Sequence, residues 1–495
     1  MNGIRAGRRL SSQSGSVLVY CLGVLVLIVL SVGYSFNASR VSGEKTRLQN
    51  TADAAAYSVA AVEARDLNFK SYTNRAMVAN QVALAQSVSL ISWARFVTRF
   101  ADNISMVTSL FPPLRVFFTA VSKGIAAAMK GLETAVGLAI NAINIIEQAL
   151  SIAQVSHHVG TLAMAEDIFN EVVKRNDPGV DRSISLSSAP FMGAYLKDHA
   201  TFTKRYSPDK VTRTNKAKKW TGVYDEHKKR MDEFRLVTLE SRDLFSKNRT
   251  YNWVGSFTVI PKYLKLRIRK TGGSELTGSA KSPNKLGSYY TWSAMDTMSV
   301  HKRRYKCSFR RGCKWRSWKE VLPIGWGAAA TRGGRPFFFE RGLGGKHRYA
   351  SSYRINKYSA AAAGAEYQSL GASGTFNGLR AFYDIQQDGL VSEAPGIALM
   401  LTKPHSGSAV KTIKHTEFGG GSDDLDLEAA GGLLNDRLVA LSQAVPYFSR
   451  PNDVSAFRRW DKLREYGNLY NPFWQPRLSE LKHRRLMLGW AATLR

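Results

Sequence analysis

Cysteine is the rarest residue in this 495-residue chain, with only three copies. Cys21 lies inside an apolar run, which leaves Cys307 and Cys313 as a pair in the segment KCSFRRGCKW. A structural zinc site needs about four ligands, and the nearest histidine is His301, so we expect no zinc here. In an oxidising compartment the pair is expected to form a local disulfide, and two unpaired thiols are the alternative.

Motifs of known enzyme classes are also missing. The chain has no G-x-S-x-G and no H-E-x-x-H sequence. GLGGKH at residues 342–347 lacks the first glycine and the final Ser/Thr of a phosphate-binding loop. His157 and His158 are adjacent, so on a helix they are expected to point to different sides, which is poor metal geometry. We predict no enzymatic activity, no metal and no cofactor.

Acidic residues are few: 38 Asp and Glu stand against 70 Lys and Arg, a net charge of +32. A basic surface attracts nucleic acid, anionic lipid or acidic polysaccharide. The run at residues 302–319 interleaves basic and aromatic side chains, which suits a polyanion. A protein interface or a solvated hairpin would have the same composition. The candidate polyanion contacts are Arg303, Arg304, Lys306, Arg310, Arg311, Lys314, Trp315 and Trp318.

Charge is absent from Ser11 to Ser39. The apolar run within this stretch is long enough to cross a hydrocarbon core of about 30 Å, so residues 16–36 are predicted to be a transmembrane helix. Arg5, Arg8 and Arg9 mark residues 1–15 as a cytoplasmic leader. A cleaved secretory signal is the alternative. The apolar positions that carry the prediction are Val17, Leu18, Leu22, Leu25, Leu27, Ile28 and Leu30.

Glycine and proline are absent from Glu44 to Phe111. Good helix formers dominate the stretch, so residues 37–111 are predicted to form a long Ala-rich helical stalk, continuous or broken once. Asp66 and Lys70 are four residues apart and are expected to form an exposed ion pair. The many alanines would let another helix approach closely, either in a second molecule or in the chain's own domain.

Pro112 and Pro113 end the stalk, and residues 112–176 are predicted to form an amphipathic helical region. Its longest uncharged runs are too short or too polar for a second membrane span, so this region is expected to pack on the stalk. Residues 177–450 contain short alternating runs typical of strands. They are predicted to form a mixed α/β extracytoplasmic domain, followed by a basic helical tail at residues 451–495. The acidic segment at 423–428 is expected to be a loop rather than a calcium site.

The segment TRLQNTADAAAYSVA after the span resembles the N-terminal module of the TadG/TadE-like family, which assembles Flp (tight-adherence, Tad) pili in bacteria. Two further segments, residues 64–86 and 468–481, look like parts of a large TadG-like subgroup. The residues that match the family motif are Leu48, Gln49, Asn50, Ala52, Asp53, Ala54, Ala55 and Ala56.

Two departures from the family qualify this resemblance. Gly15–Ser16 fits the cleavage junction of prepilin-like members, but Tyr20 stands where their glutamate would be. That glutamate is thought to neutralise a neighbour's N-terminus in a filament core. Asp181, Ser183 and Ser185 spell the D-x-S-x-S metal motif of some TadG proteins, but KRNDPGV before them is not the buried strand that such a site needs.

Together these features predict an α+β protein with one membrane span, a helical stalk, a second helical region and a strand-rich domain in the periplasm. The resemblance implies a non-enzymatic component of Tad pilus assembly, accessory or minor pilin-like, that supports adhesion. Its implied location is the bacterial inner membrane with a cytoplasmic N-terminus. Its implied partners are other Tad pilus-assembly proteins or minor pilins, with self-association through helices. The alternative is a membrane-anchored binding module for DNA or an anionic envelope polymer.

Overall fold

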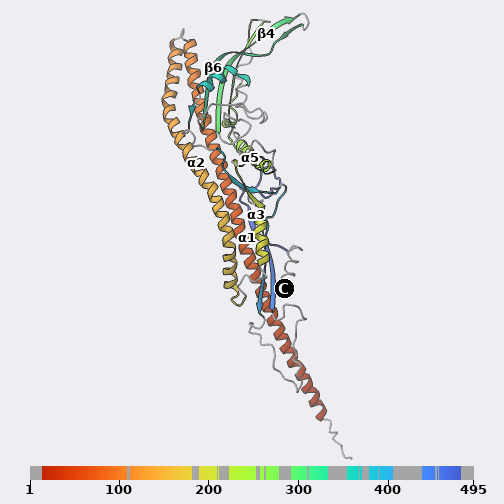
Figure 1. The fold of residues 1–495 in the computed structure, drawn as a ribbon. Coiled ribbons are helices and arrows are strands. Elements are labelled where there is room, and N and C mark those ends of the chain that lie inside the picture. Colours follow the sequence, from red (N-terminus) through yellow and green to blue (C-terminus); the bar gives the residue numbers. More distant parts are fainter. Residues whose placement is uncertain are drawn as a thin grey trace, which may run out of the picture.

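Two long helices set the length of the molecule. The computed structural model describes residues 14–108, 112–180, 189–208, 210, 222–251, 257–260, 263–277, 291–308, 312–332, 354–366, 368–370, 378–387, 389–404, 437–451, 454 and 456–480. The helices are α1 (Ser14–Val107), α2 (Pro112–Asn176), α3 (Ala189–Phe202), α5 (Gly222–Glu240), α6 (Leu244–Lys247) and α8 (Lys357–Ala365). Figure 1 shows α2 running along α1, with the N-terminal part of α1 projecting beyond the rest of the fold.

The two long helices are antiparallel. Ser122 near the start of α2 donates a hydrogen bond to Asp102 near the end of α1. At the opposite end, the Arg47 guanidinium donates to the carbonyl of Asn176, over 3.1 Å. The sequence left open whether the first helix is continuous or broken once. The structure shows one continuous helix, because α1 has no break between Ser14 and Val107. The absence of glycine and proline after Glu44 explains this, because neither helix-breaking residue interrupts the hydrogen-bond ladder.

In the part of the chain that the structure describes, three sheets lie along the side of α1. β1 (Thr203–Tyr206) pairs with β8 (Phe382–Ile385), and β10 (Arg437–Phe448) lies between β9 (Ile397–Pro404) and β11 (Trp474–Leu478). The largest sheet has the order β2-β3-β4-β6-β7, and β5 pairs with β4 outside this path. Its strands are β2 (Phe257–Ile260), β3 (Leu264–Thr277), β4 (Thr291–Ser308), β5 (Gly312–Trp315), β6 (Lys319–Ala330) and β7 (Gln368–Ser369). The predicted mixture of helices and strands is thus confirmed.

Helix α1 lies directly against the backbone of β6. A Cβ atom on Gly327 would come within 2.3 Å of the Ser92 carbonyl oxygen and 2.4 Å of the Phe96 nitrogen. The absence of a side chain at this position therefore allows the strand and the helix to touch. Ser92 also donates to Asp296 on β4 over 2.7 Å, which adds a polar contact between the helix and the sheet.

The helices and the strands share their hydrophobic cores. One core joins Leu84 and Val88 of α1 with Ile140 of α2 and Trp292 of β4, and another joins Ala55 of α1 with Leu399 of β9. The predicted stalk therefore lies inside the fold from about residue 48 onward instead of standing apart from the strand-rich region. Sequence periodicity cannot distinguish these two arrangements, because both bury an apolar helix face.

The predicted helical tail is not seen in the described part of residues 451–480. This segment has no helix there and ends in strand β11, which pairs with β10. Pro472 and Pro476 explain the difference, since a proline inside a helix removes a hydrogen bond and clashes with the preceding turn. Several sequence expectations lie outside the described residues: the leader at 1–13, Asp181, Ser183 and Ser185, the segments 342–347 and 423–428, and the tail after 480.

Candidate functional site

The N-terminal part of α1 exposes its apolar side chains on all sides. The large hydrophobic residues between Val17 and Phe36 are 39–75% exposed, whereas Leu48, the first residue of the family motif, is fully buried. All the predicted span residues lie in the exposed part, and Gly15 and Ser16 lie in the first turn of the helix. A contiguous apolar surface of this size is unfavourable in water, and its length suits a bilayer.

Helix α2 also passes a test of length and composition for a membrane span. Its position argues against that role. Glu147 contacts Gln81, and His158 contacts Asp66. At a rise of 1.5 Å per residue, these α1 residues lie about 45–70 Å beyond Phe36. A hydrocarbon core is only about 30 Å thick, so residues 147–158 of α2 and the exposed part of α1 cannot lie in the same bilayer.

The family-like motif is a packing surface within the chain. Leu48, Ala52, Ala55 and Ala56 are fully buried, and they pack against β9, β10 and the C-terminal part of α2. Gln49 donates to the carbonyl of Leu441 and to Asp53, both over 2.9 Å. The small side chains therefore allow close approach of the chain's own elements, which is the second of the two alternatives drawn from the sequence.

Three elements are tied together where the fold begins. Lys403, at the end of β9, donates to Glu44 of α1 over 2.5 Å and to Asp177 after α2 over 3.1 Å. The Lys403 side chain is buried, so the two carboxylates compensate for its lost hydration. These ion pairs hold α1 at Glu44, just after its exposed apolar part, against both the end of α2 and strand β9.

A cluster of ionisable side chains lies buried at the contact of α1, α2 and α3. Asp66 binds Lys70 over 2.7 Å, and neither side chain has exposed surface. His157 and His158 each bond one oxygen of Asp66, over 3.0 and 2.9 Å. His199 of α3 bonds Glu63 over 2.9 Å. Two expectations were therefore wrong: the Asp66–Lys70 pair is buried, and the adjacent histidines converge on one carboxylate.

The protonation states within this cluster follow from burial and pairing. Burial disfavours the ionised form of Asp66, but hydrogen bonds to the three histidines and the charge of Lys70 outweigh it and lower its pKa. Burial would also lower the pKa of His199, yet its bonds to Asp66 and Glu63 raise it to about 9. Burial lowers the pKa of His158. At neutral pH the cluster thus contains ionised Asp66 and protonated His199.

Asp66, His158 and His199 are residue types that bind metal ions, but the Lys70 ammonium group lies among their potential ligand atoms. One atom each from Asp66, His158 and His199 lie within 4.8 Å of one another. The Lys70 Nζ atom lies 2.7 Å from Asp66 and 2.9 Å from His158 Nδ1. Thr203 accepts a further bond from Lys70, over 3.2 Å. A metal ion would have to displace this cation, so the arrangement fits an internal ion pair better than a metal centre.

The two segments that look like parts of a TadG-like subgroup lie side by side. The side-chain amide of Asn68 on α1 donates to the carbonyl of Trp474 over 2.9 Å. The backbone N–H of Trp474 in turn donates to the side-chain oxygen of Asn68 over 3.0 Å. Asn74 donates to the carbonyls of Leu469 and Tyr383, both over 2.9 Å. These asparagines connect α1 to the C-terminal part of the chain. They lie six residues apart on α1, which is not a one-turn spacing, so the sequence did not single them out for this role.

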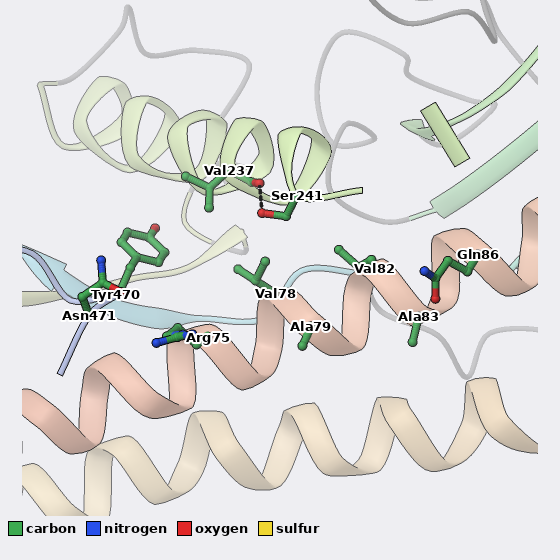
Figure 2. Close-up of a pocket in the computed structure, with 10 residues that line it drawn as sticks. All are labelled: Arg75, Val78, Ala79, Val82, Ala83, Gln86, Val237, Ser241, Tyr470 and Asn471. Atoms are coloured by element: carbon green, nitrogen blue, oxygen red, sulfur yellow. Dashed lines mark hydrogen bonds between the residues drawn. The ribbon is translucent and has the colours of Figure 1, made fainter. Parts of the chain in front are cut away.

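An open groove of about 490 Å³ lies between α1, α5 and the segment around Tyr470 (Figure 2). Figure 2 shows Val78 and Val82 of α1 facing Val237 of α5, with Arg75 and Asn471 toward one end. The lining residues include no carboxylate, histidine or cysteine. The hydroxyl groups in the groove belong to Ser241, which donates to the carbonyl of Val237, and to Tyr470.

The described residues among the predicted polyanion contacts lie on a hairpin of β4 and β5, except Trp318, which lies between β5 and β6. The structure joins Cys307 and Cys313 in a disulfide between directly opposed residues of the two strands. Arg303 and the indoles of Trp315 and Trp318 gather in cation–π contacts. Arg304, Lys306 and Lys314 are exposed. Arg310 and Arg311 lie outside the described residues.

Comparison with known families confirms the resemblance over the N-terminal segment. Residues 15–62 match the family model described as putative Flp pilus-assembly TadE/G-like. The match begins at Gly15, continues through the exposed part of α1 and includes the whole family motif, of which Leu48, Ala52, Ala55 and Ala56 are fully buried. No curated protein and no solved structure gives a significant match to the chain. The matched segment indicates involvement in Flp pilus assembly, and residues 64–86 and 468–481 lie outside it.

Proposed function

We propose that this protein is a non-enzymatic, single-pass membrane component of Tad-type pilus assembly, acting as an accessory or minor pilin-like protein that supports adhesion. One observation supports this most strongly. The segment that matches the TadE/G-like family combines an apolar helix exposed on all sides with a motif that is buried in the fold. The first part suits a bilayer and the second ties the span rigidly to the rest of the chain.

The proposed topology has residues 1–15 in the cytoplasm and the fold in the periplasm. Arg5, Arg8 and Arg9 favour retention of the leader on the cytoplasmic side. Helix α1 continues without a break from the span into the fold. Asn103 near its end contacts Ile324 of β6, so a helix along the membrane normal would carry β6 about 100 Å from the bilayer. Such a rigid arm suits contact with partners far from the inner membrane, such as other Tad pilus-assembly proteins or minor pilins.

An accessory role is favoured over that of a major filament subunit. Tyr20 occupies the position where prepilin-like members carry glutamate, and its side chain is 75% exposed on the apolar helix. A tyrosine has no negative charge at neutral pH to compensate for a neighbouring N-terminal amine. We therefore expect this protein in small amounts relative to the pilin, whether or not Gly15–Ser16 is cleaved.

Deletion of the gene in the source bacterium tests the proposal. Cells without it should lose surface pili and adhesion, and the full chain should restore both. The double variant Leu25→Arg/Leu27→Arg should fail to restore them, because each arginine at the centre of a span costs about 2.5–3.5 kcal/mol on insertion scales.

Helix α2 provides the matched control. Leu138→Arg/Ile145→Arg introduces the same charges on exposed apolar positions that the proposed topology places outside the membrane. This variant should restore piliation as the unchanged chain does. Unchanged pili and adhesion after deletion of the gene would refute the proposed function.

A further inference from the structure

The β4–β5 hairpin has two chemically different faces. Directly opposed residues on antiparallel strands share a face, and successive residues alternate between the faces. Tyr305 is opposite Trp315, and Cys307 is opposite Cys313. Lys306, between them in sequence, is opposite Lys314 on the other face. Figure 1 shows this hairpin at the end of the molecule opposite the projecting part of α1.

The aromatic face is already covered by cations of the chain itself. The Lys265 ammonium lies 4.9 Å from the Trp315 ring centre, and Arg303 lies 5.8 Å from it. Arg267 lies 4.2 Å from the Trp318 ring centre. Tyr305 packs edge-on against Trp315. Unpaired bases would need free aromatic faces on which to stack, so this face is poorly suited to single-stranded nucleic acid.

The other face carries three opposed pairs of cations. Lys306 is opposite Lys314, Lys302 is opposite Lys319, and between these pairs Arg316 donates its backbone N–H to the carbonyl of Arg304. All of these side chains are exposed except Lys302, which is half-buried. We call this set the basic ladder; its members are Lys302, Arg304, Lys306, Lys314, Arg316 and Lys319.

The basic ladder has no neutralising partner among the described residues. None of its six side chains forms an ion pair with a described carboxylate. Glu320, the acid nearest in sequence, instead accepts bonds from Ser299 and from the backbone of Ser359. Like charges directly opposite one another destabilise a sheet. Repulsion among the ladder cations is therefore unfavourable in the isolated chain, and a bound polyanion would reduce it.

We propose that the basic ladder binds the phosphate backbone of double-stranded nucleic acid without sequence preference. Pairs along the ladder are about 7 Å apart, so six charges lie within about 14 Å. A DNA duplex carries one charge per about 1.7 Å of axis, or about eight over this length. Its major groove also admits a two-stranded β-ribbon. All six ladder side chains are lysine or arginine, and contacts from such side chains to phosphate oxygens carry no sequence information.

Binding should be measured on the full chain in a non-ionic detergent with a labelled 25-base-pair duplex of mixed sequence. Six phosphate contacts predict an affinity loss of about 1,000-fold between 50 and 200 mM salt. Arg304→Gln, Lys306→Gln, Lys314→Gln and Arg316→Gln together should reduce the slope of log affinity against log salt by about 4. An unrelated duplex sequence should bind equally well.

A matched variant separates the ladder from the overall charge. Arg115→Gln, Lys123→Gln, Lys130→Gln and Lys174→Gln remove four exposed cations from α2. This control should keep most of the affinity, and both variants should unfold at or above the wild-type temperature. An equal loss from the two variants would overturn the proposal. So would absence of duplex binding, or tighter binding of a carboxylated polysaccharide such as polygalacturonate at equal charge concentration.

These outcomes are distinct from failure of the proposed function. Nucleic-acid binding by the purified chain does not depend on pili, and loss of pili after gene deletion does not depend on the ladder. A strain that carries the ladder variant should assemble pili normally. Loss of piliation in that strain would assign the ladder to assembly instead.

Discussion

Asn68 and Trp474 are 406 residues apart in sequence, yet they form a reciprocal pair of hydrogen bonds. The Asn68 side-chain amide donates to the Trp474 carbonyl over 2.9 Å, and the Asn68 side-chain oxygen accepts from the backbone N–H of Trp474 over 3.0 Å. The Trp474 ring is buried against Phe202 and Phe448. Through this pair the start of β11 is held against α1, which connects the sheet of β9, β10 and β11 to the helix that begins with the exposed apolar segment.

Asn68→Ala should lower the free energy of unfolding by about 1–3 kcal/mol, because it leaves a buried donor and acceptor without partners. Chemical denaturation of the full chain in detergent, followed by tryptophan fluorescence, measures this change. Asn50→Ala on the exposed side of the same helix is the control and should change the stability by less than about 0.5 kcal/mol. Equal effects of the two substitutions would contradict a structural role for the pair.

Lys70→Met should be strongly destabilising, because it leaves Asp66 ionised in a buried site without its closest cation. Removing one partner of a buried ion pair typically costs about 3–5 kcal/mol. The double variant Asp66→Asn/Lys70→Met should recover part of this loss, and a double-mutant cycle measures the coupling.

The exposed pair Glu171–Arg175 has the same four-residue spacing and serves as the control. Arg175→Met should cost at most about 0.5 kcal/mol. If Lys70→Met and Arg175→Met lower the free energy of unfolding by the same amount, the buried pair contributes no more stability than an exposed pair.

Glu147 should make the stability fall as the pH rises from about 4.5 to about 8. Burial raises its pKa to about 8 despite the two bonds from Gln81. The unfolded chain releases this proton near pH 4.5. The folded state therefore holds an extra proton between these values, and the associated stability is complete below pH 4.5 and lost as the pH rises through 8.

Glu147→Gln should remove that dependence, since the side chain is neutral at every pH. Relative to this variant, the wild type should lose on the order of 4 kcal/mol between pH 4.5 and 8. Denaturation curves across this range measure the difference. Glu166→Gln, at an exposed position on the same helix, should leave the wild-type pH profile unchanged. A pH profile of Glu147→Gln that matches the wild type would refute the assignment.

Gly327→Ala should separate α1 from β6, since a Cβ atom there would overlap the backbone at Ser92 and Phe96. Overpacking of this kind typically costs about 1–3 kcal/mol. Gly131→Ala is the matched control, because a Cβ at Gly131 meets no atom within 4 Å. In the middle of α2 it should stabilise the chain by up to about 1 kcal/mol. The two alanine substitutions should thus shift the melting temperature in opposite directions.

The helices and the family segment could be predicted from sequence because their signals are local. The uncharged run after Ser11 and the glycine-free stretch after Glu44 determine α1 almost alone. The motif from Leu48 to Ala56 is contiguous, so it can be recognised without knowing what packs on it. The conclusion that this alanine-rich surface faces the chain's own strands required the structure, because a partner's helix would need the same small residues.

The buried cluster could not be predicted, since its members come from three helices. Asp66 and Lys70 have the spacing of an ordinary surface pair. Only the packing of α2 and α3 places His158 and His199 beside them and removes the water. The two faces of the β4–β5 hairpin were partly predictable from the alternation of basic and aromatic residues. The register that opposes Lys306 and Lys314 depends on the hairpin turn, which the sequence alone does not specify.

The central claim is that a single N-terminal span holds the fold on the outer side of the inner membrane. Labelling of single cysteines with a membrane-impermeant maleimide tests it most directly, in spheroplasts of a strain with Cys21→Ala. Cysteines introduced at Lys123, Leu138 and Lys174 of α2 should all react before the inner membrane is opened, and a cysteine at Gly3 should react only afterwards. Protection of the α2 positions in intact spheroplasts, or early reaction at Gly3, would contradict the account.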